Sequence, residues 1–160
     1  MTDFEGLIRC LRDHDVRFVL VGGFAATVLG SARTTIDLDV VYARNPDNLD
    51  RLARALAPLS PYLRGAPPGL PFHLDPSTLA RGTNFTLTTS MGDLDLLGEI
   101  VGGGSYDQLL TQTRRIRVFG IDLDVVTLPQ LIRLKRAAGR PKDLEALAEL
   151  EMLLDEQIEP

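Results

Sequence analysis

Apolar positions recur along this chain with two different periods, and the period separates predicted helices from predicted strands. Phe4, Leu7, Ile8 and Leu11 follow helical spacing directly after a Thr-x-x-Glu capping box at residues 2–5. Helices are predicted over residues 3–14, 24–29, 46–57, 106–112, 128–138 and 142–157. Strands are predicted over residues 16–21, 36–42, 83–89, 93–97, 115–119 and 121–126.

The order of these elements predicts an α/β (α+β) fold, in which a mixed β-sheet is flanked by helices and followed by a helical C-terminal end. We expect one domain, with a core over residues 1–126 and C-terminal helices over residues 127–160 packed on that core. Residues 58–76 are rich in proline and glycine and predict a long irregular connection, with a short helical turn at 76–80. Such a connection either borders a substrate cleft or is a plain surface excursion. Three consecutive glycines predict a flexible loop over residues 98–105.

The composition narrows the class of protein. Hydrophobic residues make up 44% of the 160 positions, which is ample for a buried core. A single cysteine, Cys10, leaves no internal disulfide, and two histidines, His14 and His73, leave little room for zinc or a histidine-based triad. No apolar run reaches the length of a membrane span and the first residues lack a secretory signal pattern, so we expect a cytoplasmic protein without a membrane partner. Because the net charge is −5, contact with nucleic acid needs a local basic patch.

The candidate chemistry centres on two glycines and an acidic strand. Gly22 and Gly23 follow the predicted strand over residues 16–21, where backbone N–H groups at the start of a helix can meet a phosphate. Asp37 and Asp39 alternate with apolar residues, so both project from one face of their strand. Two carboxylates on one face repel each other unless a cation lies between them, and hard oxygen ligands suit Mg²⁺. The alternative is an ordinary sheet with an acidic, solvated face.

The glycine pair, the spacer and the Asp-x-Asp strand together resemble the nucleotidyltransferase superfamily typified by DNA polymerase beta. Residues 33–39, Arg-Thr-Thr-Ile-Asp-Leu-Asp, are most similar to the minimal bacterial branch that includes AbiEii-type and MNT-type toxins. The resemblance covers residues 16–150 and is most specific over 22–39. One departure is the Gly-Gly turn, because many active members have Gly-Ser, whose hydroxyl can bind a triphosphate.

The resemblance implies a third carboxylate on a later strand, beside the first pair. Asp95 fits best because its strand follows the helix-and-loop crossover, whereas Asp93 lies nearer the turn and suits a solvated role. Asp122 and Asp124 belong to a second Ile-Asp-Leu-Asp-Val-Val segment, at residues 121–126. They are predicted to be exposed hairpin residues, and the alternative is that one of them completes the site.

The superfamily resemblance thus implies Asp37, Asp39 and Asp95 as catalytic metal ligands for Mg²⁺ or Mn²⁺. Two ions roughly 3.5–4 Å apart can hold the attacking and the leaving oxygen of a displacement at phosphorus. In the superfamily pattern Asp37 and Asp39 share both ions, while Asp95 binds the ion next to the acceptor hydroxyl and can act as its base. Nucleotidyl transfer that relies on charge and position needs little other chemistry, which agrees with the shortage of histidine and cysteine.

Basic residues supply the candidate phosphate ligands. Lys135 stands on the inner stripe of a predicted helix, so its ammonium either snorkels to the helix edge or reaches a phosphate. With residues 140–143, Arg-Pro-Lys-Asp, it resembles the lysine and Lys-Asp motifs of the toxin branch, which favours the phosphate role. Asp143 either adds a favourable charge at a helix N-terminus or orients Lys135 or a nucleotide group. Arg33 and the glycine pair at 22–23 are the remaining phosphate candidates, and the alternative for Arg33 is a surface charge.

The leading hypothesis is a metal-dependent nucleotidyltransferase that moves a nucleoside monophosphate from a nucleoside triphosphate (NTP) to an acceptor. Similarity to the toxin branch implies the toxin of a toxin–antitoxin pair, with tRNA or protein as acceptor and an antitoxin protein as partner. An antibiotic adenylyltransferase is a second enzyme hypothesis. The rival from another class is a catalytically silent nucleotide- or partner-binding module with the same fold.

Overall fold

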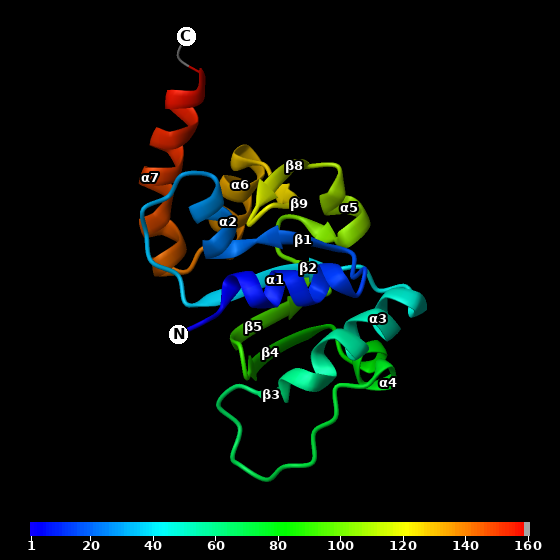
Figure 1. Cartoon of the computed structure of the whole chain (residues 1–160). Helices are drawn as coiled ribbons and strands as arrows, with labels where there is room; N and C mark the ends of the chain where they lie inside the picture. Colours follow the sequence, from blue (N-terminus) through cyan, green and yellow to red (C-terminus); the bar gives the residue numbers. More distant parts are fainter. Residues whose placement is uncertain (159–160) are drawn as a thin grey trace.

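A seven-stranded sheet forms the centre of the molecule, with its strands in the order β3-β4-β5-β2-β1-β9-β8 (Figure 1). The computed structural model describes residues 1–158. The strands of this sheet are β1 (Phe18–Val21), β2 (Asp37–Tyr42), β3 (Tyr62–Leu63), β4 (Asn84–Thr89), β5 (Gly92–Leu97), β8 (Thr113–Val118) and β9 (Ile121–Val126). The helices are α1 (Phe4–Asp13), α2 (Gly22–Val28), α3 (Pro46–Leu56), α4 (Pro76–Arg81), α5 (Tyr106–Leu110), α6 (Leu128–Ala138) and α7 (Pro141–Ile158), with a 3-10 turn at Ala57–Leu59.

The central strand β2 has neighbours of opposite direction. It pairs antiparallel with β1 and parallel with β5, and β1 in turn pairs parallel with β9. The pairs β3–β4, β4–β5 and β8–β9 are antiparallel. The sheet is therefore mixed, as the sequence predicted. Because parallel strands begin at the same edge of a sheet, the first residues of β2 and β5 lie side by side.

Helices cover the sheet on both of its faces. All four residues of β1 are buried, and since successive side chains of a strand point to opposite faces, a strand buried at every position is covered on both. Of the apolar stripe predicted for the first helix, Leu7, Ile8 and Leu11 are buried in α1 and Phe4 is partly buried. Helix α1 lies beside α3 (Figure 1). The two C-terminal helices, α6 and α7, pack against each other. Within residues 1–158, none of the helices has both the length and the apolar character needed to cross a bilayer.

Two segments differ from the sequence prediction. Residues 98–105, predicted to be a flexible loop, form a small hairpin of β6 (Glu99–Ile100) and β7 (Gly104–Ser105). That prediction is wrong because Gly102 and Gly104 adopt positive φ angles of 86° and 78°, so the glycines serve a tight turn and do not loosen the chain. The long connection after α3 contains the short strand β3, whose residues pair with β4 and place the following residues beside the sheet.

A buried amide fastens α3 to the segment before β1. Asn48 is completely buried and accepts a 2.8 Å hydrogen bond from the backbone N–H of Arg17. Its amide nitrogen donates to the carbonyls of Arg17 and Ala43, at 3.1 and 2.7 Å. Three main-chain groups thus bond to one side chain, although the Arg17 carbonyl also accepts from the Ala43 N–H at 3.1 Å, and buried polar groups without partners are costly.

We expect Asn48→Ala to lower the free energy of unfolding by roughly 2–4 kcal/mol, because it removes three hydrogen bonds to the main chain and leaves the Arg17 N–H and the Ala43 carbonyl without this partner. Asn45→Ala is the matched control, since Asn45 is exposed and its side chain makes no capping hydrogen bond. Its cost should stay within about 0.5 kcal/mol. Urea unfolding followed by circular dichroism measures both variants. Equal costs would contradict the role assigned to Asn48.

Candidate functional site

Three carboxylates from two separate segments meet on one face of the sheet. β2 and β5 run parallel in a register that sets Asp37 beside Asp93 and Asp39 beside Asp95. One oxygen from each of Asp37, Asp39 and Asp95 lies within 4.8 Å of the other two. Converging carboxylate oxygens of this kind can hold a divalent cation. The structure thus brings the three predicted residues together, and their catalytic role stays a prediction.

Two oxygens of this cluster have no hydrogen-bond donor aligned with them. Asp39 Oδ1 and Asp95 Oδ1 are buried, and no N–H or O–H group of the described chain is placed to donate to either atom. A buried carboxylate oxygen is costly unless a hydrogen bond or an opposite charge compensates it. A divalent cation held by these carboxylates would offset their negative charge, so the residues fit the metal that the sequence predicts.

The crowding of carboxyl groups changes their protonation. Burial raises the pKa of Asp39 to about 8, and the charge of Asp95 with a side-chain hydrogen bond between the two residues adds to the effect. Burial, followed by the charge of Asp95, also raises the pKa of Asp37. In the metal-free protein at neutral pH, a proton on Asp39 therefore removes part of the negative charge that a cation would otherwise offset.

The glycine pair lies directly beside the acidic cluster. α2 begins at Gly22, immediately after β1, and Val21 of β1 is the strand partner of Asp39. Gly22 has a φ of +71°, and a Cβ at this position would overlap Asp39 Oδ2. A Cβ at Gly23 would clash in the same way with Thr35 Oγ1. Gly22 is required both by its backbone conformation and by its close approach to a predicted metal ligand.

A cavity of about 390 Å³ opens beside the carboxylates. Its walls join the acidic residues of β2 and β5 to polar residues of α6 and α7. The residues that these helices and the turn between them contribute include Lys135, Arg140, Lys142 and Asp143. The volume falls in the range of small-molecule sites, and the cavity brings positive side chains close to the predicted metal ligands.

Lys135 and Asp143 meet in the wall of this cavity. Lys135 Nζ lies 3.5 Å from Asp143 Oδ1, and 18% of the Lys135 side chain is exposed. Asp143 is completely buried and accepts a 2.6 Å hydrogen bond from Arg140 Nε. Burial opposes the ionisation of Asp143, but the hydrogen bonds and charge of Arg140 and the charge of Lys135 outweigh it, and its pKa is lowered. Asp143 lies in the first turn of α7 and also contacts Lys135, so the helix-terminus role and the role of orienting Lys135 are both compatible with this geometry.

Arg33 lies in a neighbouring cavity of about 460 Å³, which shares Asp37 and Asp39 with the first. Its side chain is 48% exposed and forms a loose ion pair with Glu145 of α7, with 3.8 Å between the charged atoms. The position beside the carboxylates suits a phosphate ligand, and the exposure suits a surface charge. Both roles predicted for Arg33 are compatible with its place in the fold.

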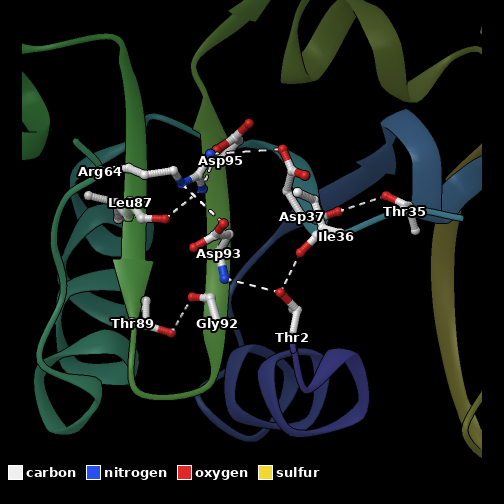
Figure 2. Close-up of polar contacts among 10 residues, drawn as sticks. All are labelled: Thr2, Thr35, Ile36, Asp37, Arg64, Leu87, Thr89, Gly92, Asp93 and Asp95. Carbon is white, nitrogen blue, oxygen red and sulfur yellow. Dashed lines mark hydrogen bonds and ion pairs between the residues drawn. The ribbon is translucent and has the colours of Figure 1, made fainter.

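The sequence prediction missed a cation inside the acidic cluster. Arg64 follows β3 and reaches past β4 to β5, where Nη2 lies 2.8 Å from Asp95 Oδ1 and Nε lies 3.5 Å from Asp93 Oδ2 (Figure 2). Nη1 lies 3.8 Å from Asp37 Oδ2. Asp93 is therefore an ion-pair partner and not the solvated residue predicted. The one signal in the sequence is that Arg64 is the only lysine or arginine within residues 58–76.

Asp122 and Asp124 take no part in the acidic cluster. Each forms an ion pair with an arginine of β8, at 3.6 Å to Arg117 and 3.2 Å to Arg115. The predicted exposure holds for Asp122, whose side chain is 57% exposed. It is wrong for Asp124, which is 21% exposed and lies on a strand that has β8 on one side and β1 on the other.

The comparison with solved structures gives the class of fold. Over 93% of this chain and 94% of the other, the structure is similar to a Thermotoga maritima crystal structure described as a "putative nucleotidyltransferase". The two chains share 16% sequence identity, and the TM-score is 0.55. This chain therefore has a nucleotidyltransferase-like fold, and a shared fold does not by itself establish a shared activity. No family model and no curated protein matches the sequence.

Gly22→Ala tests the close approach between the glycine turn and Asp39. Gly120→Ala is the matched control, because Gly120 has a similar φ of +77° with open space around it. The control should lose about 1–2 kcal/mol of folding free energy from the unfavourable φ alone. Gly22→Ala should lose roughly 1–3 kcal/mol more, because the new methyl group displaces Asp39. Denaturant unfolding of both variants in metal-free buffer measures the difference, and similar losses would show that the turn does not press on Asp39.

The raised pKa of Asp39 predicts that the metal-free protein becomes less stable as the pH rises. Folded Asp39 keeps its proton up to a pKa of about 8, whereas an unfolded aspartate, with a pKa of 3.8, has already released it. The free energy of unfolding should therefore fall between about pH 5 and pH 8. Urea unfolding in EDTA across this range is the measurement. Asp39→Asn, which carries no titrating group there, should flatten the curve; an equal slope in wild type and variant would contradict the assignment.

Proposed function

We propose that this protein is a metal-dependent nucleotidyltransferase that transfers a nucleoside monophosphate from an NTP to an acceptor. The observation that carries the proposal is the convergence of Asp37, Asp39 and Asp95 beside the Gly22 turn, with two buried oxygens that lack donors. The nucleotidyltransferase-like fold supports the same conclusion. An acidic face without a ligand would not need its carboxylates buried against one another.

The three carboxylates would hold Mg²⁺ or Mn²⁺. When bound, such an ion supplies positive charge that neutralises phosphate oxygens and orients the reacting groups. In the proposed reaction the acceptor oxygen bonds to the α-phosphorus, the bond to pyrophosphate breaks, and the hydroxyl proton passes to a carboxylate oxygen of Asp95. Asp95 suits this step because its Oδ1 has no aligned donor within residues 1–158.

Basic side chains on the opposite wall of the cavity would bind the triphosphate. Lys135 is largely buried and is held by Asp143, so its ammonium is positioned before a ligand arrives. Lys142 lines both cavities of the site, and its charge acts on Asp37. The glycine pair leaves the N-terminal turn of α2 free of side chains where it faces the site, which lets a phosphate approach the backbone. Arg33 would contact the triphosphate from the neighbouring cavity.

Within this class of enzyme, we propose that the protein is the toxin of a toxin–antitoxin pair. This assignment rests on the similarity of residues 33–39, and of Lys135 with residues 140–143, to the minimal bacterial branch. Under this assignment the acceptor is tRNA or protein, and an antitoxin protein is the partner. If the acceptor is an antibiotic, the protein is an adenylyltransferase of small molecules.

The test is a transfer assay with each α-labelled NTP, Mg²⁺ and total tRNA, in the presence and absence of cell extract. We expect Mg²⁺-dependent transfer of label, and the labelled product identifies the acceptor as RNA, protein or a small molecule. Asp39→Asn should lower the rate by at least about 100-fold, because it removes a metal ligand. Asp124→Asn is the matched control, since it makes the same change in an identical six-residue segment that lies outside the site.

The two variants separate the outcomes. A rate that falls in Asp39→Asn and not in Asp124→Asn supports the proposed enzyme. Mg²⁺-dependent NTP binding without transfer to any acceptor would favour the catalytically silent nucleotide-binding module. Equal loss in both variants would mean that the effect comes from the fold and not from the acidic site.

A further inference from the structure

Arg64 is held by β4 at its backbone and at its guanidinium. Its backbone N–H donates to the carbonyl of Thr86 at 3.0 Å, and its Nη2 donates to the carbonyl of Leu87 at 2.6 Å. Nε faces Asp93 in an ion pair of 3.5 Å. The guanidinium is therefore held over the acidic cluster by the main chain of β4 and by Asp93 (Figure 2). The side chain is 27% exposed.

The contact between Arg64 and Asp95 is an ion pair without an aligned hydrogen bond, unlike the contacts of Arg64 to β4. Nη2 lies 2.8 Å from Asp95 Oδ1, but its N–H groups do not align with that oxygen, which remains without a hydrogen bond among residues 1–158. The interaction is one of charge, and an arginine–carboxylate pair gains most when it is bidentate and aligned. Asp95 also belongs to the three carboxylates that can hold a metal. One carboxylate thus faces two competing cations.

We propose that Arg64 is a positioning residue that competes with the divalent metal for Asp95. While the site is free of metal, the guanidinium holds the neighbouring carboxylates of β2 and β5 together; the metal must draw Asp95 away from it. This inference rests on the proposed metal site and adds that metal affinity is set by an arginine from the connection after α3. Asp93, in turn, is the anchor of Arg64 and not a metal ligand.

If Arg64 competes for Asp95, the site binds a divalent metal more weakly than the same three carboxylates would without the guanidinium beside them. A positive charge within about 4–6 Å of a carboxylate lowers its affinity for a proton by roughly one to three powers of ten, and the same repulsion acts on a metal cation. Removal of the guanidinium should therefore strengthen metal binding, although it removes stabilising contacts from the folded protein. A residue that only supports the fold would do the opposite, because its loss would loosen the carboxylates and weaken binding.

The experiment titrates the full chain with Mn²⁺ and follows free Mn²⁺ by electron paramagnetic resonance. Arg64→Gln should bind Mn²⁺ about tenfold more tightly than wild type. Arg117→Gln is the matched control, since it removes the same charge from an Arg–Asp pair of β8 and β9 outside the site, and its affinity should equal that of wild type. Arg64→Lys keeps a positive charge without the fork of the guanidinium and should fall between wild type and Arg64→Gln.

Each result either supports or overturns the inference. Unchanged or weaker Mn²⁺ binding in both Arg64→Gln and Arg64→Lys would overturn the inference. In that case the proposed metal site still stands if Asp39→Asn abolishes Mn²⁺ binding. Mn²⁺ binding that Asp39→Asn does not affect would remove the metal site and the inference together. If Arg64→Gln folds poorly, Arg64→Lys alone decides, because any tighter binding in that variant requires competition at Asp95.

Discussion

The folded structure depends on offsetting the mutual repulsion among the carboxylates of two adjacent strands. Four aspartates, Asp37, Asp39, Asp93 and Asp95, stand in two adjacent pairs on the parallel strands β2 and β5. Such a ladder is stable only if positive charge or protons offset it. The fold supplies a proton on Asp39 and the guanidinium of Arg64. Neither is a tight partner for Asp95 Oδ1, which leaves a place for a stronger cation.

Segments far apart in the sequence bring positive charge to the acidic cluster on β2 and β5. The parallel pairing of β2 with β5 requires a long crossover, and that crossover carries α3, β3 and β4. Because β3 pairs with β4, the crossover also delivers Arg64 to the cluster. From the other side, α6 and α7 add Lys135 and Asp143. Positive charge from Arg64 and Lys135 thus offsets part of the negative charge that the strand aspartates bring together.

Local patterns in the sequence predicted most of the fold and part of the candidate site. Helical and strand periods gave the elements, and the resemblance led to Asp95, which the structure places beside Asp39. Arg64 could not be predicted, because its position depends on a two-residue strand too short to show a period. The hairpin at residues 98–105 was missed for a related reason: glycine permits both a loose loop and a tight turn, and only the surrounding structure selects one.

The segment Ile-Asp-Leu-Asp-Val-Val shows what a motif by itself cannot decide. At 121–126 its two aspartates face arginines, because the register of β8 and β9 sets Arg117 beside Asp122 and Arg115 beside Asp124. At 36–41 the same letters face the carboxylates of β5. The cross-strand neighbours of residues 121–126 are arginines that form ion pairs with both aspartates. The neighbours of residues 36–41 are aspartates, so negative charge accumulates there. The capacity to bind a metal belongs to the pairing of the strands, and the motif gives only the side chains.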